Sequence, residues 1–168
     1  MVIWIIGLSG SGKSTIAKIV YNSLKRKENN TVWLDGDQVR KIYNDKLKFT
    51  LKNRETNAER LSKLTKFLSD QNVNVVGSVL SNFPKWQKWN KKNIKNYKKI
   101  YIKFNFKNLI KRDIKNLYKK ALKGKKKNVV GVDIKFNEPL KSDLIIDNNK
   151  NLKNFKNIAN KILKFVLK

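Results

Sequence analysis

The chain has 168 residues, 40% of them hydrophobic and 10% aromatic, and a formal net charge of +28. This length and composition predict one globular domain, and no apolar run reaches the roughly 18 residues of a membrane span, so we expect a cytoplasmic protein. The absence of Cys and His excludes Ser-His-Asp and Cys-His nucleophile systems, thiolate or imidazole zinc sites, and phosphohistidine chemistry.

The positive charge has two interpretations. Only five of the 40 basic residues are Arg, and the rest are Lys interleaved with Asn and Ile along the whole chain. Because Lys, Asn and Ile share A/T-rich codons, compositional drift explains the pattern, and we favour it over selection for binding nucleic acid. In either case the charge attracts small anionic substrates, to an extent that salt screens.

Apolar runs alternate with longer amphipathic or polar stretches along the chain. This alternation predicts an α/β fold, a three-layer sandwich of helices on both faces of a five-stranded parallel sheet, formed by residues 1–168 as one domain. The first run is too short and lacks the charged leader of a signal peptide, so we expect a buried strand. In chain order the expected elements are strand 2–6, helix 12–27, strand 31–35, helix 54–71, strand 73–81, helix 84–97, strand 99–104, helix 108–122, strand 142–147 and helix 151–167.

A glycine-rich segment, GLSGSGKS at residues 7–14, follows the first strand and fits GxxxxGK[ST] without a gap. Glycines let the backbone wrap a phosphate closely, and the N–H groups of the loop and the helix start point at the anion. Lys13 is expected to reach the β- and γ-phosphate oxygens, and the hydroxyl of Ser14 to ligate Mg²⁺. We therefore predict a site for ATP and Mg²⁺, although such loops serve GTPases, motor ATPases, synthases and small-molecule kinases alike.

The second strand ends in LDGDQVR at residues 34–40. Asp35 and Asp37 could hold a magnesium-bound water and accept a hydroxyl proton, and Arg40 could clamp an acceptor phosphate. Taken alone, DGD is also a common turn sequence, so this segment needs its neighbours for an interpretation.

Three later segments bear on function or core packing. The expected helix 84–97 places Trp86, Trp89, Asn93 and Tyr97 on related turns, which indicates either an apolar stripe or a path for a single nucleic-acid strand; we favour the stripe. The Lys-rich stretch 119–128 is typical of a mobile lid, which we place around residues 106–130. The last helix carries a core-facing stripe of Leu152, Phe155, Ile158, Ile162 and Phe165.

Taken in order from residue 2 to residue 147, the motifs resemble those of the adenylylsulfate kinase family. That family carries GLSGxGKST, LDGDxxR, a GFS segment followed by DRxxNxRR, RDxKGLYxKA and a tail like NFTGxDxPYExPxxPDLxID. This chain reads GLSGSGKST, LDGDQVR, LKFTLKNRETNAER, RDIKNLYKKA, NVVGVD and SDLIID. The resemblance implies an ATP-dependent kinase that phosphorylates the 3′-hydroxyl of a nucleotide, which in the family has its 5′-phosphate linked to sulfate.

The resemblance also implies roles for individual residues, with Phe49 stacked on the acceptor base and Lys119 in the lid over the phosphates. The implied catalytic residues are Lys13, Asp35 and Asp37, with Ser14 and Asp35 at the metal. The implied ATP-binding residues are Gly7, Ser9, Gly10, Ser11, Gly12, Lys13, Ser14, Thr15 and Arg112. The implied acceptor-binding residues are Asp37, Arg40, Phe49, Arg54, Asn57, Leu80, Ser81, Lys119 and Val129.

The departures from the family pattern lie on the acceptor side. Val129 stands where the family has the second Phe of an aromatic sandwich, which removes a stacking face worth about 1–3 kcal/mol per base. Asn82 replaces the Pro of the family's SPYRxxR segment, and further differences fall at Asn53, Glu59 and Asn116. The residues that the resemblance assigns to ATP match the family pattern. We therefore interpret the differences as evidence of a different acceptor, and not of an inactive enzyme.

A base-binding site with one aromatic ring in place of two is narrower and suits a pyrimidine base. The segments NVVGVD and FPKWQKW resemble a branch of the family that phosphorylates cytidine 5′-diphosphoramidate for capsular polysaccharide decoration. We favour that acceptor over adenylyl sulfate, and both over another nucleotide or a polyol.

Competing interpretations remain open. A nucleoside-monophosphate kinase should have several Arg in its lid, whereas Arg112 is the only Arg after residue 60. A nucleic-acid-binding module would use the basic charge, but we do not expect nucleic acid or a membrane as a partner. The aromatic residues expected at the surface permit a homodimer.

Overall fold

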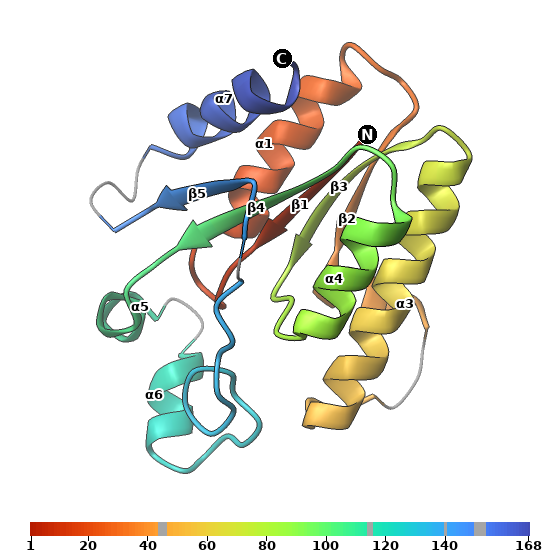
Figure 1. The fold of residues 1–168 in the computed structure, drawn as a ribbon. Coiled ribbons are helices and arrows are strands. Elements are labelled where there is room, and N and C mark those ends of the chain that lie inside the picture. Colours follow the sequence, from red (N-terminus) through yellow and green to blue (C-terminus); the bar gives the residue numbers. More distant parts are fainter. Residues whose placement is uncertain (44–46, 114–115, 140, 150–153) are drawn as a thin grey trace.

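The protein forms a five-stranded, all-parallel sheet covered by helices on both faces (Figure 1). A computed structural model describes residues 1–43, 47–113, 116–139, 141–149 and 154–168. The strands lie in the order β2-β3-β1-β4-β5, which confirms the predicted fold class. They are β1 (Val2–Ile6), β2 (Thr31–Asp35), β3 (Asn74–Val79), β4 (Tyr97–Lys103) and β5 (Leu144–Asp147). The helices are α1 (Lys13–Lys25), α2 (Gly36–Ile42), α3 (Leu51–Asp70), α4 (Pro84–Asn93), α5 (Phe106–Arg112), α6 (Leu117–Leu122) and α7 (Phe155–Val166).

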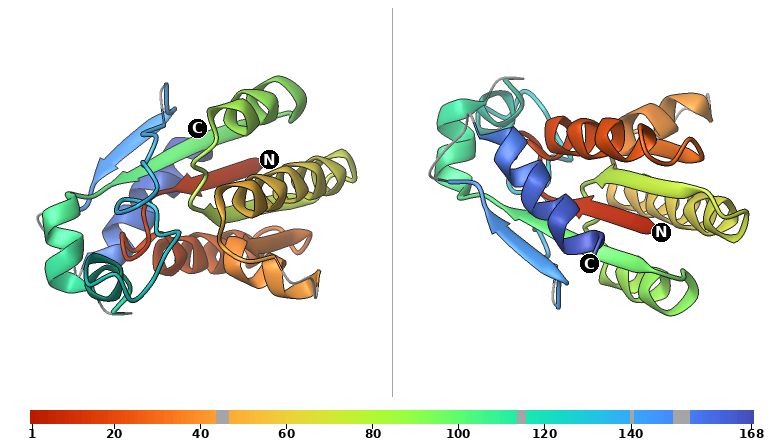
Figure 2. Two further views of the ribbon diagram at one scale, coloured as in Figure 1. Left: turned by 90° about the horizontal axis from the view of Figure 1, so that it is seen from below. Right: turned by 90° about the horizontal axis from the view of Figure 1, so that it is seen from above.

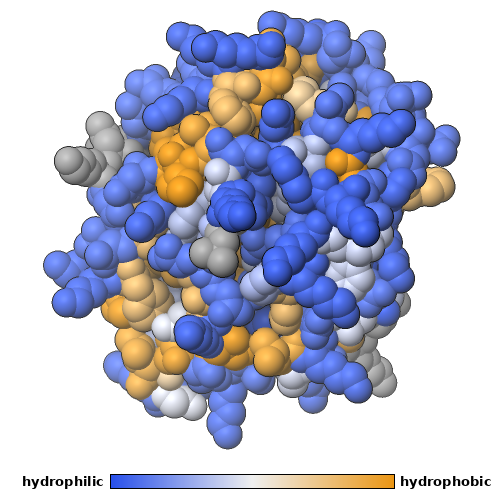
Figure 3. Space-filling model, in the orientation of Figure 1, coloured by the Kyte–Doolittle hydropathy of each residue, from blue (hydrophilic) through white to orange (hydrophobic). Residues whose placement is uncertain are grey.

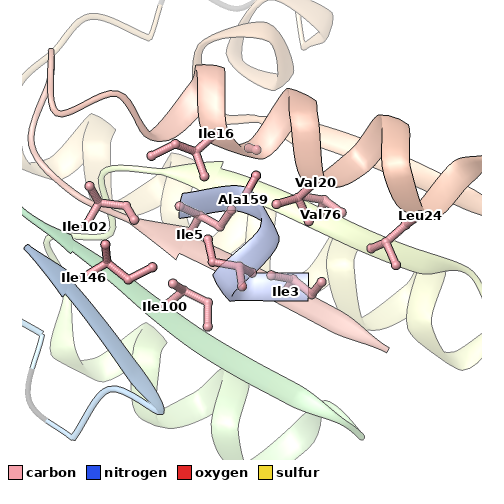
Figure 4. Close-up of a cluster of buried hydrophobic side chains, with 12 residues drawn as sticks. Ile3, Ile5, Ile16, Val20, Leu24, Val76, Ile100, Ile102, Ile146 and Ala159 are labelled. Carbon is pink, nitrogen blue, oxygen red and sulfur yellow. The ribbon is translucent and has the colours of Figure 1, made fainter. Parts of the chain in front are cut away.

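Each face of the sheet buries one set of alternating side chains, as strand geometry requires. Ile3 and Ile5 of β1 point to the face covered by α1 and α7, where they meet Ile16 and Val20 (Figures 2 and 4). The other side chains of β1 point to the opposite face, which α3 and α4 cover. Because both faces are buried, β1 is a continuous apolar run without a polar face.

A glycine makes room for an indole on the α3/α4 face of the sheet. Trp4 is paired in register with Gly77 of β3. A Cβ at Gly77 would lie 2.3 Å from Cε3 of Trp4, so any side chain there would collide with the indole ring. The ring of Tyr97 also lies near the indole, with 6.3 Å between the ring centroids. Trp4 is therefore held against the sheet with only 2% of its surface exposed.

Two of the helix predictions are wrong in their boundaries. The helix expected over residues 84–97 ends at Asn93, because Asn96 turns the chain with a positive φ of 49° and Tyr97 already belongs to β4. The four-residue stripe assigned to that helix is therefore divided between a helix and a strand. The helix expected over residues 108–122 is two helices, since Asn116 has a φ of 50° and precedes α6.

Side-chain caps account for other differences in the helix boundaries. Helix α3 begins three residues before the expected start because the Thr50 hydroxyl accepts a hydrogen bond from the backbone N–H of Asn53 (3.3 Å). Helix α2 was not predicted; it begins at Gly36, and the carboxylate of Asp35 caps it. Helix α7 begins at Phe155, and Leu152 lies outside the described residues.

In the face that Figure 3 shows, hydrophilic residues cover most of the area and hydrophobic ones gather in smaller patches. Among the helices in the described part of the chain, none combines the length and the apolar character needed to cross a membrane.

Candidate active site

The segments that follow β1, β2 and β3 meet at the carboxyl edge of the sheet, where ligands bind in open α/β folds. They form a cleft of about 740 Å³, which residues 126–130 also line. A second cavity of about 190 Å³ adjoins it between the glycine loop and helices α5 and α6. Ser9, Lys13, Ser14 and Asp37 line both, so the two form one continuous site.

The glycine loop is held in shape by side chains from distant parts of the chain. The Tyr118 hydroxyl of α6 donates a hydrogen bond to the carbonyl of Ser9 (2.9 Å), and the Asn148 amide donates one to the carbonyl of Ser11 (3.0 Å). Gly12 has a φ of 92°, and a Cβ there would lie 2.7 Å from Cε1 of Phe155. These contacts fix the backbone whose N–H groups can bind phosphate at the start of α1.

Asp35 is the most highly connected carboxylate of the site. Its Oδ2 accepts hydrogen bonds from the hydroxyls of Ser14 (3.0 Å) and Ser78 (2.7 Å), and its Oδ1 accepts from the backbone N–H groups of Asp37 (3.0 Å) and Gln38 (3.4 Å). Ser78 in turn accepts a hydrogen bond from Nε1 of Trp33 (3.0 Å).

The surroundings of Asp35 keep its carboxyl ionised. Burial raises its pKa, but the hydrogen bonds from Ser78, Ser14 and the two backbone N–H groups together outweigh burial and hold the pKa below its usual value. A fixed negative charge therefore lies beside the hydroxyl of Ser14.

Ser14 and Asp35 are compatible with Mg²⁺. Magnesium in kinase sites is typically bound by one or two protein oxygens together with substrate phosphates and water, and not by a cage of protein ligands. The described residues contain no group of three or more carboxylate, imidazole or thiol side chains that could form such a cage. The Ser14 hydroxyl and the Asp35 carboxylate next to it match the sparser arrangement.

Two arginines flank one aromatic ring on the opposite side of the cleft. The guanidinium carbons of Arg40 and Arg54 lie 5.0 Å and 5.2 Å from the centroid of Phe49. Arg54 also donates hydrogen bonds to the carbonyls of Phe49 (2.9 Å) and Asn128 (2.7 Å). Arg54 thus connects the start of α3 to the segment that carries Val129, and the cleft between them has positive charge and one aromatic face.

The buried Asn82 explains one departure from the family pattern. Its amide donates a hydrogen bond to the carbonyl of Lys135 (2.9 Å), and its Oδ1 accepts one from the N–H of Asn137 (2.7 Å). Proline could make neither contact. Asn82 therefore ties the segment after β3 to the loop that follows residues 126–130.

Most of the predicted site residues lie together. On the ATP side, Gly7 and Ser11 do not line the cavities: Gly7 packs against Ser11 and the carbonyl of Ile102, and Ser11 is fully buried. On the acceptor side, Lys119 is exposed and lines neither cavity, and its backbone N–H donates to the Asp113 carboxylate (2.8 Å). The predicted residues that line one or both cavities are Ser9, Gly10, Gly12, Lys13, Ser14, Thr15, Asp35, Asp37, Arg40, Phe49, Arg54, Leu80, Arg112 and Val129.

Asn57 and Ser81 line a third, smaller cavity next to the cleft of about 740 Å³. Sequence reasoning gave no individual role to several residues that line the site. Trp33 and Ser78 belong to strands, carry no motif and reach the site only through the fold. Tyr118, Asn128 and Val130 lie in segments that resemble the family motifs, and Lys126 and Lys127 lie in the Lys-rich stretch assigned to the lid.

The parallel sheet, the phosphate loop after β1 and the aspartate that ends β2 define a P-loop kinase. The family model described as adenylylsulphate kinase matches residues 1–147. The chain belongs to this family, and it is an ATP-dependent phosphotransferase that acts on a hydroxyl group.

Relatives in the family differ in their named substrates. The chain is 43% identical over 147 residues to the cytidine diphosphoramidate kinase of Campylobacter jejuni, covering 88% of this chain and 85% of the relative. It is 34% identical over 148 residues to the adenylyl-sulfate kinase of Oceanobacillus iheyensis, covering 87% and 74%. The structure of the Mycobacterium tuberculosis APS kinase in complex with AMPPNP and APS superposes with a TM-score of 0.87 at 26% identity, covering 99% of this chain and 97% of that one.

Proposed function

We propose that this protein transfers the γ-phosphoryl group of ATP to the 3′-hydroxyl of cytidine 5′-diphosphoramidate. The observation that carries the proposal is the cleft of about 740 Å³, called the acceptor cleft from here on, which both Phe49 and Val129 line and which we assign to the acceptor base. One aromatic face and one aliphatic face suit a small pyrimidine ring better than a purine, which would gain from a second stacking surface. The 43% identity to a cytidine diphosphoramidate kinase supports the same acceptor.

On the donor side, we assign the phosphates of ATP to residues 9–15, with Lys13 at the β- and γ-oxygens and Arg112 in the adjoining cavity. Ser14 would hold Mg²⁺, with the Asp35 carboxylate behind it; the ion when bound neutralises charge on the transferred group. Lys13 donates a hydrogen bond to the carbonyl of Leu8 (3.3 Å), which places its ammonium group over the loop.

On the acceptor side, we assign the proton of the attacking hydroxyl to Asp37. The four hydrogen bonds to Asp35 stabilise its ionised form and make that carboxylate a poor base. Asp37 lines both the 190 Å³ cavity, which we assign to ATP, and the acceptor cleft, and this supports a position between the two substrates. Arg40 and Arg54 would bind the acceptor phosphates.

We further propose that residues 106–130 act as a lid. Two observations support this: residues 126–130 line the cleft, and Gly124 has a φ of 69° with open space where a Cβ would be, which is typical of a solvent-exposed turn. Closure would exclude water from the transferred phosphoryl group.

The alternative of adenylyl sulfate as acceptor has the support of the relative from Oceanobacillus iheyensis. A nucleic-acid-binding module has less support, because Trp86 is only 8% exposed and Trp89 packs against it with 5.8 Å between ring centroids, so Trp86 offers no free face to a base. A homodimer stays a prediction.

The test is an acceptor screen. The protein is incubated with ATP and Mg²⁺ together with cytidine diphosphoramidate, adenylyl sulfate, or neither, and the release of ADP is followed. We expect acceptor-dependent turnover with cytidine diphosphoramidate at the higher kcat/KM. A higher kcat/KM for adenylyl sulfate would support the alternative, and no turnover of either would contradict both.

A further inference from the structure

A small cavity of about 70 Å³ lies behind the acceptor cleft, among β1, β3, α3 and α4. Asp37, Arg40 and Arg54 line both this cavity and the acceptor cleft, so the two spaces are continuous. The inner cavity is too small for a nucleoside, and it can accept only the end group of a ligand whose base and ribose lie in the larger cleft.

Five side chains that line this cavity have a buried polar atom without a hydrogen-bond partner among the residues that the structure describes. Three of these atoms are donors, the indole N–H groups of Trp4 and Trp86 and the Nε of Arg40, and two are acceptors, the Oδ1 atoms of Asn57 and Asn90. The two tryptophans and the two asparagines are at least nine-tenths buried. A buried polar atom without a partner costs free energy, so five of them at one cavity indicate a polar ligand there.

The orientation of one amide is fixed by its own hydrogen bond. Nδ2 of Asn57 donates to the carbonyl of Gly36 (3.4 Å), which leaves Oδ1 as the unpartnered atom. The cavity therefore requires a ligand that both accepts hydrogen bonds from indole N–H groups and donates hydrogen bonds to amide oxygens.

The end groups of the two candidate acceptors differ in this respect. A sulfate or an ionised phosphate has only acceptor oxygens, and the oxygens of Asn57 and Asn90 would stay unpaired beside it. A phosphoramidate has acceptor oxygens and an amino group on the same phosphorus, so it can satisfy both kinds of protein atom.

We propose that this cavity is the subsite for the terminal phosphoramidate of the acceptor. The indole N–H groups of Trp4 and Trp86 donate to its oxygens, and Oδ1 of Asn57 and Oδ1 of Asn90 accept from its amino group. The inference rests on the proposed function and adds to it the residues that distinguish an amino group from an oxygen.

The test compares two ligands that differ only at this end group, cytidine diphosphoramidate and cytidine 5′-diphosphate. Their dissociation constants are measured by calorimetry with AMPPNP present, for the wild-type protein and the variants Asn90→Leu, Trp86→Phe and Trp89→Phe. Trp89 lies on the same helix as Trp86 but does not line the cavity, so Trp89→Phe is the matched control.

Asn90→Leu removes an acceptor that only the amino group can use. We expect it to weaken binding of the phosphoramidate about tenfold and to leave binding of cytidine 5′-diphosphate within about twofold, since one neutral hydrogen bond corresponds to roughly a factor of ten. Trp86→Phe removes a donor that both ligands can use, so it should weaken both, and Trp89→Phe should weaken neither. The ratio of the two constants is insensitive to any loss of folded protein.

The outcomes distinguish failure of this inference from failure of the proposed function. If the wild-type protein turns over cytidine diphosphoramidate but Asn90→Leu leaves the ratio unchanged, the cavity holds only water and this inference is overturned while the proposed function stands. If the wild-type protein neither turns over nor binds the phosphoramidate, the proposed function fails and the inference fails with it.

Discussion

The donor and acceptor halves of the site are built on different principles. In the donor half, side chains such as Tyr118 and Asn148 hold the glycine loop, and the backbone of that loop is left to bind phosphate. In the acceptor half, the side chains themselves line the cleft, as Phe49, Arg54 and Val129 do. Backbone N–H groups bind any phosphate in the same way, whereas side chains select. The donor half therefore carries the features that define the kinase family, and we propose that the acceptor half determines which nucleotide is phosphorylated.

Lys13→Ala should have the largest effect, because it removes the only side-chain cation that the donor half is assigned at the β- and γ-phosphates. We expect kcat to fall by roughly 10²–10³-fold, as for other losses of a single group that stabilises the transition state. ADP release at saturating acceptor measures it. Lys18→Ala, on the exposed face of the same helix, is the control; equal activity of the two variants would contradict the role of Lys13.

Arg54→Ala tests whether the acceptor half binds its substrate independently of ATP binding in the donor half. We expect the KM for the acceptor to rise about 10–100-fold with the KM for ATP within about twofold, because the variant loses a charged contact and the links to Phe49 and Asn128. Initial rates at varied acceptor and varied ATP separate the two constants. Lys63→Ala, on the same helix, should change neither, and a parallel rise of both in Arg54→Ala would mean that the halves are not independent.

Val129→Phe sharpens the comparison by restoring the family's aromatic residue. We expect kcat/KM for adenylyl sulfate relative to cytidine diphosphoramidate to rise about tenfold, by gain of a stacking face. Because Val129 is only 2% exposed, the larger side chain should also lower stability by about 1–3 kcal/mol. Kinetics with both acceptors and thermal unfolding measure the two effects, and an unchanged ratio would remove Val129 from the choice of base.

Ser78→Ala should have the smallest effect at neutral pH and a clear effect on pH dependence. Ser78 helps to hold the pKa of Asp35 below its usual value, so its loss raises that pKa and moves the acid end of the stability profile, measured by thermal unfolding at a series of pH values, to higher pH. Since the folded pKa of Asp35 is lowered, its contribution to stability is present above about pH 3.9 and is lost as the pH falls through the folded pKa.

Ser78→Ala should reduce this stability contribution as well. Trp33→Phe, which removes only the N–H that Ser78 accepts, should shift the profile less and in the same direction. A profile shifted to lower pH would contradict the assignment.

Contiguous features were predictable from the sequence and scattered ones were not. The glycine loop and the strands were predicted from short local patterns. The family motifs assigned Arg40, Arg54 and Phe49 to acceptor binding, and these residues do line one cleft. Helix α2 was missed because Asp35 looks like part of a turn until its carboxylate is seen to cap the helix.

The inner cavity was beyond sequence reasoning for a different reason. Trp4, Asn57, Trp86 and Asn90 come from four places in the chain, and the indole of Trp4 fits there only because Gly77 lies under it. Trp86 looked like one member of an apolar stripe, and its buried N–H without a partner is visible only in the fold.

The most direct test of the account is a competition between acceptors. Equal concentrations of cytidine diphosphoramidate and adenylyl sulfate are incubated with the protein, ATP and Mg²⁺, and the ratio of the two 3′-phosphorylated products is measured at low conversion. We predict that the cytidine product dominates, by roughly tenfold or more, because an aromatic stacking face for a purine is missing at Val129. A dominant adenosine product would contradict the claim that the acceptor half of this site is built for a pyrimidine phosphoramidate.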